Sequence, residues 1–258
     1  MKKFVQIGIV SFCVVSIFFM ITIYGLSNDM NLKNLPISDV SIDSFTRTII
    51  WGKLADGSKV EILNVAALPK ESKNPSGFAL NNAPFRFVAL SPDKNKIAFS
   101  CGTGNEWSGI YDLNTKRIKQ LSFFFDSSSG ELFWSPNGKY IAEEYEGADG
   151  YYKIRIKDIE SNTNILTIDP SFLEKRKIKI GRESLTKNFK EGVDLIENPE
   201  IHFYKWGPDS KKVFFEISRV EYLRYPIKMR KPQEKIKDIR LGRWSINTDN
   251  FNLMKVSE

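Results

Sequence analysis

Cysteine and histidine are scarce in this sequence, and their scarcity limits the chemistry that it can perform. The chain contains two cysteines, Cys13 and Cys101, and a single histidine, His202. Cys13 falls inside an apolar N-terminal run, so the rest of the chain has one thiol, which excludes a disulfide-stapled fold and a cysteine-rich zinc site. One histidine also gives little support to a His-based metal site or a Ser-His-Asp triad. We therefore expect a non-enzymatic protein with no catalytic, cofactor-binding or metal-binding residues.

Few groups remain that could act in catalysis. For His202, which lies in a strand, a packed or edge position is a simpler interpretation than a ligand or a base, and Cys101 could pair only with it. Paired carboxylates for glycoside chemistry could come from one acidic cluster, made of Glu143, Glu144, Glu146 and Asp149. Because Glu143 and Glu144 are adjacent in a strand, they point to opposite faces of it. A hydrated edge is the simpler interpretation of this cluster.

Basic residues exceed acidic residues by 38 to 31, which gives a net charge of +7. Residues 171–240 contain 18 of the basic and 11 of the acidic residues, so this stretch carries the whole excess. A local positive excess favours anionic partners such as lipid headgroups, acidic polymers or nucleic acid. A soluble, well-solvated surface is the simpler alternative.

An uncharged, mostly apolar run occupies residues 4–26, directly after Lys2 and Lys3. As a helix this run spans roughly 34 Å at ~1.5 Å per residue, enough to cross a hydrocarbon core of ~30 Å. The apolar part of a cleaved signal peptide is usually only about 7–15 residues long. We therefore expect residues 1–27 to anchor the protein in the cell membrane, with cleavage near Ser27 and secretion as the alternative. The two lysines, with Asp29 after the run, place the N-terminus in the cytoplasm and the remainder outside.

One pattern occurs three times along the rest of the chain, around Pro92, Pro136 and Pro208. Each copy has an apolar strand, a Ser/Gly-Pro-Asp/Asn turn, one or two lysines and a β-branched residue five places after the proline. Proline presets φ, and Asp or Asn bonds its own backbone, so each copy is predicted to form a hairpin. A second hairpin follows each copy, at residues 109–118, 154–165 and 243–251. A related hairpin at residues 50–60 has an Asp-Gly turn.

Two successive hairpins form a four-stranded meander, which is one blade of a β-propeller. Pro92 and Pro136 lie 44 residues apart, as expected for one blade, and about 28 further residues are inserted before Pro208.

The repeats resemble the TolB-type, WD40-like propeller repeat, in which Ser-Pro-Asp-Gly-x-x-Ile-Ala-Phe is followed by a strand and Asp-x-x-Thr-Gly. The nearest copy has Ser91-Pro92-Asp93, Ile97-Ala98-Phe99 and Asp112-Leu113-Asn114-Thr115-Lys116. Ser135-Pro136-Asn137-Gly138 is the second match, and Gly207-Pro208-Asp209 is the most diverged. The resemblance covers roughly residue 85 to the C-terminus. It implies propeller blades but no particular function, because such blades serve many roles.

The sequence therefore predicts an all-β fold, a propeller-like array of four-stranded antiparallel blades preceded by one N-terminal transmembrane or signal helix. A full TolB-type protein has six blades, whereas here three and a half to four are legible, and there is no room for an N-terminal domain of the TolB kind. Residues 28–46 are assigned to a linker and residues 47–258 to the propeller-like domain, with insertions at 169–200 and 218–240. The first insertion is expected to begin with a helix, at a Ser171-x-x-Glu174 capping box. The blades form either a small closed ring, with a degenerate blade between residues 37 and 84, or an open arc completed by a partner; a β-sandwich is the structural alternative.

The turns and connections of the array should lie on opposite faces. Successive turns of a meander alternate between its two ends, so the short turns within hairpins share one face, the short-turn face. The longer connections between hairpins, both insertions included, share the other, the long-loop face, and long loops on a rigid scaffold are where binding residues concentrate. We expect partner-binding residues there, both aromatic and cationic: Trp107, Phe124, Tyr222, Arg224, Tyr225, Lys228, Arg230 and Lys231.

These features favour an extracytoplasmic binding module that uses its long-loop face to bind an envelope protein or an anionic polymer. The alternatives are an extracytoplasmic propeller enzyme, of the polysaccharide lyase or hydrolase type, and a sensor of small ligands. The enzyme alternative predicts that His202 or the acidic cluster lines a pocket on the long-loop face. Nucleic acid is disfavoured as a partner by the export signal.

Overall fold

The computed structural model describes residues 35–69, 84–103, 106–124, 127–148, 150–178, 187–190, 193–224 and 234–256. The anchor expected at residues 1–27 lies outside these ranges. A search of the described ranges finds no helix with the length and apolar character needed to span a membrane.

Four antiparallel sheets make up the described chain. The first sheet contains β1 (Ile37–Ile42), β2 (Ile49–Leu54) and β3 (Lys59–Asn64), and is followed by the 3-10 helix η1 (Val65–Ala67). The second contains β4 (Phe85–Leu90), β5 (Lys96–Cys101), β6 (Glu106–Asp112) and β7 (Arg117–Phe124). The third contains β8 (Ser128–Trp134), β9 (Tyr140–Glu146), β10 (Tyr152–Asp158) and β11 (Asn164–Ile168). After helix α2 (Pro170–Lys175), the last contains β12 (Lys187–Lys190), β13 (Val193–Trp206), β14 (Lys212–Arg224), β15 (Glu234–Asn247) and β16 (Leu253–Val256).

The sheets confirm the predicted all-β meanders. The second and third sheets have four strands each, in the order β4-β5-β6-β7 and β11-β10-β9-β8, and the last has five. The first has three strands, β1-β2-β3, and is thus the degenerate blade that was considered between residues 37 and 84. Its strand β1 lies within the segment that the sequence assigned to a linker, so that assignment is wrong for residues 37–42. The short strand was missed because a strand of six residues of which three are polar gives a weak pattern.

The three repeated turns have the same hydrogen bonds, as their shared sequence predicts. The amide of Ser91 donates to the carbonyl of Lys96 over 2.9 Å, and the equivalent bonds in the third and last sheets are 2.9 and 2.8 Å long. The second residue after each proline has positive φ, with values of 59° at Lys94, 67° at Gly138 and 59° at Ser210. Only glycine adopts this conformation without steric cost, so Gly138 fits it best. The turn, rather than the identity of each residue, is what the repeats preserve.

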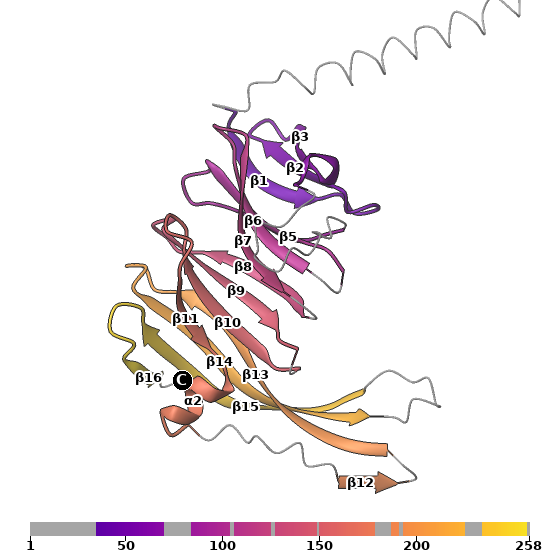
Figure 1. The fold of residues 1–258 in the computed structure, drawn as a ribbon, viewed down its shortest axis with the longest axis vertical. Helices are drawn as coiled ribbons and strands as arrows, with labels where there is room; N and C mark the ends of the chain where they lie inside the picture. Colours follow the sequence, from indigo (N-terminus) through magenta and orange to yellow (C-terminus); the bar gives the residue numbers. More distant parts are fainter. Residues whose placement is uncertain are drawn as a thin grey trace, which may run out of the picture.

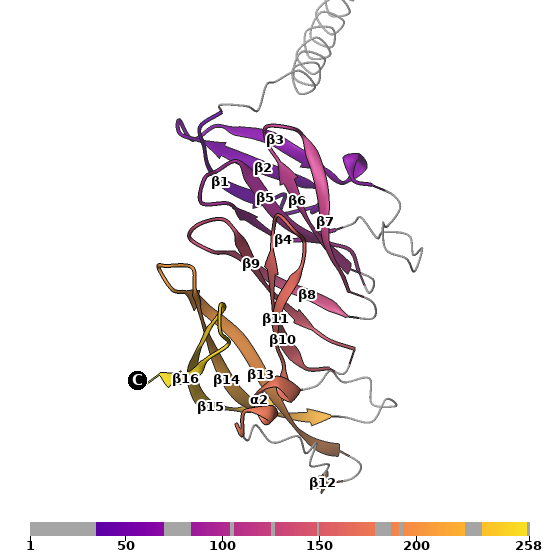
Figure 2. The same cartoon turned by 60° about the vertical axis from the view of Figure 1, so that its left-hand side comes forward.

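The four sheets follow one another along the long axis of the molecule (Figure 1). The first sheet lies at one end and the last sheet at the other, and the turned view shows the same order (Figure 2). Packing joins β1 to β4, β4 to β8 and β10 to β13, which are contacts between sheets that follow one another in sequence. The described sheets thus form an open arc and not a closed ring.

Apolar side chains fill the spaces between neighbouring sheets. Ile50, Phe85 and Phe99 belong to a cluster between the first and second sheets, and Ile156 and Phe215 to one between the third and last. A smaller cluster joins the second and third sheets. Helix α2 packs on the cluster between the third and last sheets through Leu173, which is fully buried. The helix itself was predicted, but its N-cap is Asp169, whose side chain accepts from the amide of Phe172 over 2.7 Å, and not Ser171.

An indole N–H joins each of two successive pairs of sheets. Trp134 donates to the carbonyl of Ala89 over 3.1 Å, and Trp206 donates to the carbonyl of Phe133 over 3.0 Å. Both acceptors lie two residues before the Ser-Pro turn of the preceding repeat, so the two bonds are equivalent. The tryptophan before the turn therefore holds each of these two sheets on the one before it.

Replacing Trp206 with phenylalanine should destabilise the fold through the loss of this bond. A half-buried carbonyl of Phe133 would be left without its donor, which costs about 1–3 kcal/mol. Urea unfolding of the full chain, followed by circular dichroism, measures the change. Trp244→Phe is the matched control, since the indole N–H of Trp244 is buried without a hydrogen-bond partner among the described residues. Equal losses of stability in the two variants would contradict the assignment.

Candidate interaction surface

Strands β13, β14 and β15 are much longer than the others and extend beyond the body of the last sheet (Figure 1). They have 14, 13 and 14 residues, against at most 8 in each strand of the first three sheets. We name the extension the arm; it comprises residues 193–200, 218–224 and 234–240. Much of the second insertion, expected as an irregular loop at 218–240, is therefore paired strand. The sequence missed this because β14 and β15 pair residues far apart in the chain, as in Val220 with Asp238.

The arm leaves the body of the sheet at a β-bulge. Ile217 pairs with Gly242 whereas Ser218 pairs with Arg240, so one residue of β15 is left without an opposite partner. Gly242 has φ of +135°, a conformation that residues with a side chain rarely adopt. A bulge bends a strand and increases its twist. Gly242 thus fixes the point where the arm turns away from the last sheet.

Two of the predicted partner-binding residues lie in the core instead of on a surface. Trp107 has an exposed fraction of 0% and packs edge-on against Phe99 at 5.2 Å between ring centroids. Phe124 is 2% exposed and lies 5.5 Å from the ring of Tyr145. Both prefer the interior because they sit on strands β6 and β7 at positions that face neighbouring apolar groups. The prediction that they contact a partner is wrong for this structure.

The other predicted residues belong to the arm or to the segment that joins its strands. Tyr222 and Arg224 are in β14, where Tyr222 pairs with Lys235. Tyr225, Lys228, Arg230 and Lys231 lie outside the described residues. Tyr222 and Arg224 therefore lie near the C-terminal end of β14, in the sheet that is farthest from the first sheet (Figure 2).

The root of the arm is tied to the third sheet by a cluster around His202. The Nε2 atom of His202 is 3.0 Å from a carboxylate oxygen of Glu200, and its Nδ1 atom is 3.9 Å from one of Glu144. Glu144, on β9, also accepts a hydrogen bond from the amide of Phe203. The ring of Tyr152, on β10, lies 5.3 Å from the imidazole. Side chains from two sheets thus surround one histidine.

The cluster keeps His202 protonated near neutral pH. The carboxylates of Glu144 and Glu200, the second of them hydrogen-bonded to the imidazole, raise the pKa of His202 from 6.5 to about 9, against the opposing effect of burial. Burial, with the nearby charge of Glu200, raises the pKa of Glu146. An imidazolium held between two carboxylates is a structural cation and has no free lone pair with which to accept a proton.

Glu143 and Glu144 of the acidic cluster do not form the hydrated edge that the sequence suggested, and Asp149 lies outside the described residues. Glu143 is fully buried and accepts hydrogen bonds from the hydroxyls of Ser108 and Ser122, the latter over 2.6 Å. Glu144 faces the last sheet, so the prediction that these neighbours point to opposite faces is confirmed. Each carboxylate joins its strand to a different adjacent sheet. Glu143 can be fully buried, and Glu144 partly buried, because their polar partners come from those sheets.

Cys101 does not form a pair with His202. Its thiol is fully buried in the cluster between the first and second sheets, and burial, followed by the charge of Glu106, raises its pKa. A thiolate is therefore disfavoured there. Over the part of the chain that the structure describes, no three His, Cys, Asp or Glu side chains are grouped so as to hold a metal ion.

Sequence reasoning missed the residues that join the sheets. The contact between Glu200 and His202 could in principle have been predicted, since residues two apart on a strand share a face. The partner from β9, Glu144, carries no local signal, because it meets His202 only through the packing of two sheets. The same holds for Lys157, whose ammonium donates to the carbonyl of Leu121 across a different pair of sheets.

The stability of the protein should fall with rising pH in a window set by His202. Folding raises the pKa of His202 from 6.5 to about 9. The contribution of the protonated imidazole to the free energy of unfolding is therefore complete below pH 6.5 and is lost as the pH approaches 9. Because His202 is the only histidine, its ring protons can be titrated by NMR without assignment. A midpoint near 6.5 would contradict the cluster. In His202→Gln, the decrease in unfolding free energy across this window should disappear.

Neither a family model nor a curated protein matches the chain. Solved structures do show similarity. TolB from Acinetobacter baumannii is 14% identical with a TM-score of 0.41, over 88% of this chain and 55% of that chain. Dipeptidyl peptidase 4 from Porphyromonas gingivalis is 13% identical with a TM-score of 0.43, over 93% and 34%.

The β-propeller domain of the Trilobed protease from Pyrococcus furiosus, described as having an open velcro topology, is 13% identical with a TM-score of 0.35. It is matched over 84% of this chain and 66% of that domain. The chain thus spans about half the length of the TolB structure that it matches. In its repeats and its four-stranded sheets, the chain is similar to TolB-like β-propeller proteins.

Proposed function

We propose that this protein is a non-enzymatic, extracytoplasmic binding module that is anchored at a membrane by its N-terminal segment. It binds its partner with the arm and the segment that joins the arm's strands. The single observation that carries the proposal is the length of β13, β14 and β15, which builds a protruding surface, with β12 paired along its edge, on an otherwise regular array (Figure 1). Protruding strands are a surface that partners can reach from several sides.

The position of the arm fits this role. The described chain begins at the first sheet, and the arm lies at the opposite end of the long axis (Figure 1). A protein held in a membrane by residues 1–27 would therefore present the arm away from the bilayer. This arrangement favours a partner in the surrounding envelope over the lipid of the protein's own membrane.

The charge of the arm indicates which kind of partner fits. Its strands contain five basic and six acidic residues, so they are close to neutral. The positive excess of residues 171–240 comes from other segments, including residues 225–233, which contain Lys228, Arg230 and Lys231. Strands of mixed charge, joined by a segment that is basic in sequence, suit a protein with an acidic patch better than a uniformly charged polymer.

The chemistry of the cluster at the root supports binding over catalysis. His202 is held as an imidazolium between Glu144 and Glu200, which suits a structural brace and not a general base. The brace fixes the arm to the third sheet and so limits the conformational entropy that binding would otherwise cost.

Shortening the arm should abolish capture of the partner and leave the sheets intact. The variant lacks residues 222–236 and joins Glu221 to Lys237, which are paired across the strands, through an Asn-Gly turn. The measurement is affinity capture from solubilised membranes with the full chain and with the variant, and circular dichroism checks the fold. We expect the full chain to recover a protease-sensitive component that the variant does not recover.

The matched control is Lys211→Gln with Lys212→Gln, which removes two exposed cations from the short-turn face of the same sheet. This variant should recover the same component as the full chain. Equal capture by the arm variant would overturn the role of the arm. Capture of a protease-resistant polymer, released at high salt, would replace the protein partner by an anionic polymer.

The anchor is tested separately. We expect the full chain to stay in the membrane pellet after an alkaline wash and to keep its N-terminal segment when its intact mass is measured. Release into the supernatant, together with loss of the residues before Asn28, would show that the segment is a cleaved signal peptide.

A further inference from the structure

The first sheet has an outer face, turned away from the second sheet, that carries an aromatic ring. On β2, Ile50 is fully buried in the cluster between the first two sheets. Because side chains alternate along a strand, Ile49 and Trp51, on either side of it, lie on the outer face, where both are partly exposed. We name this surface, together with the turn at residues 43–48, the end face. The strands contribute Asp39, Ser41, Ile49, Trp51, Lys53, Lys59 and Glu61 to it.

The turn of the end face holds a second aromatic ring in solvent. Phe45 has an exposed fraction of 94%, and no other large apolar side chain that the structure describes exceeds 56%. A carboxylate oxygen of Asp43 accepts from the amides of Thr46 and Arg47, over 2.7 and 3.2 Å. The guanidinium of Arg47 donates to two carbonyls of β4, over 2.9 and 2.7 Å. The ring is therefore displayed by a turn that is fastened to itself and to the second sheet.

The end face has no net charge. It carries three cations and three acids, Arg47, Lys53 and Lys59 against Asp39, Asp43 and Glu61. A surface without an excess of either sign gains little from a strongly charged partner. Aromatic rings among lysines suit the level of the lipid headgroups, because tryptophan is enriched there and a lysine can extend its ammonium group into water.

The length of chain between the anchor and the first sheet indicates what the end face meets. Leu35 already packs against the cluster between the first two sheets, and Ile37 is 1% exposed. Eight steps along the chain separate Ser27 from Leu35, which is at most about 29 Å when fully extended. A bilayer that holds residues 1–27 is therefore close to the first sheet. The strands of this sheet run across the long axis of the molecule, so its outer face is turned along that axis, away from the arm (Figures 1 and 2).

We propose that the end face rests on the protein's own bilayer, with the rings of Phe45 and Trp51 at the level of the headgroups. This proposal rests on the proposed anchor and adds a second contact with the same membrane. An anchor alone would leave the array free to tilt on its tether. Two rings seated in the bilayer fix the angle at which the array stands.

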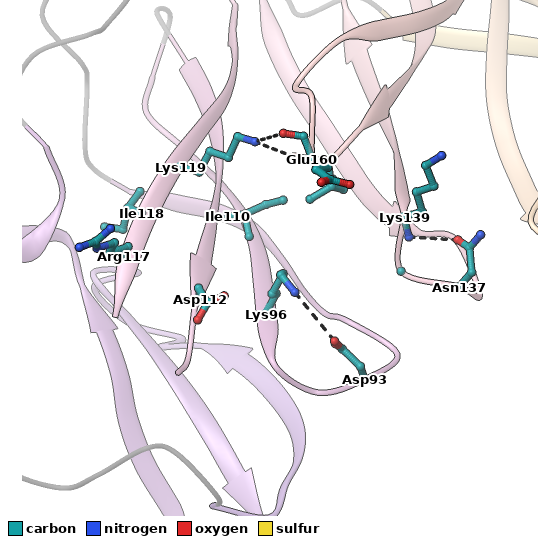
Figure 3. A pocket seen from close by; sticks show the side chains of 12 residues that line it. Asp93, Lys96, Ile110, Asp112, Arg117, Ile118, Lys119, Asn137, Lys139 and Glu160 are labelled. Carbon is teal, nitrogen blue, oxygen red and sulfur yellow. Dashed lines mark hydrogen bonds and ion pairs between the residues drawn. The ribbon is translucent and has the colours of Figure 1, made fainter. Parts of the chain in front are cut away.

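Directional contacts at the joints between sheets carry this angle to the arm. Arg47 joins the first sheet to the second. The ammonium of Lys119, on β7, donates to the carbonyls of Ile159 and Glu160 in the third sheet, each over 2.7 Å (Figure 3). The cluster around His202 fastens the third sheet to the root of the arm. Contact between the end face and the bilayer would thus set the direction in which the arm points.

The test introduces a tryptophan at the displayed position and measures whether lipid reaches it. The full chain with Phe45→Trp is reconstituted into phosphatidylcholine vesicles with and without bromine on the acyl chains near the headgroups, which quenches indole emission on contact. The emission that the substitution adds should be blue-shifted and mostly quenched by the brominated lipid. Because the end face has no net charge, high salt should leave this quenching unchanged.

Phe251→Trp is the matched control, since Phe251 is an exposed phenylalanine in the turn between β15 and β16, in the sheet at the other end of the array. The emission that this substitution adds should not be quenched. In the otherwise unmodified chain, Trp51→Phe should remove most of the quenchable emission, because the other four tryptophans lie in the second, third and last sheets.

Flotation of the vesicles distinguishes this proposal from the anchor. A chain that does not float with the vesicles contradicts the anchor, and the end-face contact with it. If the chain floats and Phe45→Trp is quenched no more than Phe251→Trp, the anchor stands and the end-face contact is overturned. A blue shift without quenching also overturns it, because protein, such as a second copy of the chain, would then cover the ring in place of lipid.

Discussion

The joint between successive sheets is the constraint on which the rest of this structure depends. Because the described sheets do not close into a ring, each inner sheet is held only by its two neighbours, as in a solenoid. Apolar packing alone would allow twisted sheets to slide over one another. Directional bonds from side chains to backbone carbonyls of the preceding sheet, made by Trp134, Lys157 and Trp206, fix their register.

Charge is buried in these joints in a way that the sequence did not reveal. Glu143 binds two serines of the second sheet, and Glu144 binds the last sheet through Phe203 and His202. A buried carboxylate is tolerated only where donors meet it, so a wrongly packed neighbour would leave it uncompensated. The two adjacent residues thus specify both neighbours of the third sheet, and the same bonds position the root of the arm.

The local features of the fold could be predicted and the nonlocal ones could not. The turns around Pro92, Pro136 and Pro208 follow from short-range chemistry, and with them the antiparallel meanders. Pairing of β14 with β15 joins residues that are distant in sequence, and an alternating, charge-rich strand of the arm resembles a solvated loop when it is read alone. For the same reason Trp107, beside a turn, was mistaken for a surface residue, although packing between sheets buries it.

The outer face of the last sheet shows why the end of the arc need not be covered by a further blade. At the positions where the inner sheets have Ala98 and Ala142, fully buried against the following sheet, the last sheet has Phe214. Its ring is covered by the ammonium of Lys205 at 5.4 Å, and the guanidinium of Arg243 lies 4.0 Å over Tyr204. Cations spread over rings make this face compatible with water, as polar outer faces do in the terminal repeats of solenoids. A partner that only completed the ring would have to displace these cations, whereas the arm can be reached without disturbing any joint between sheets.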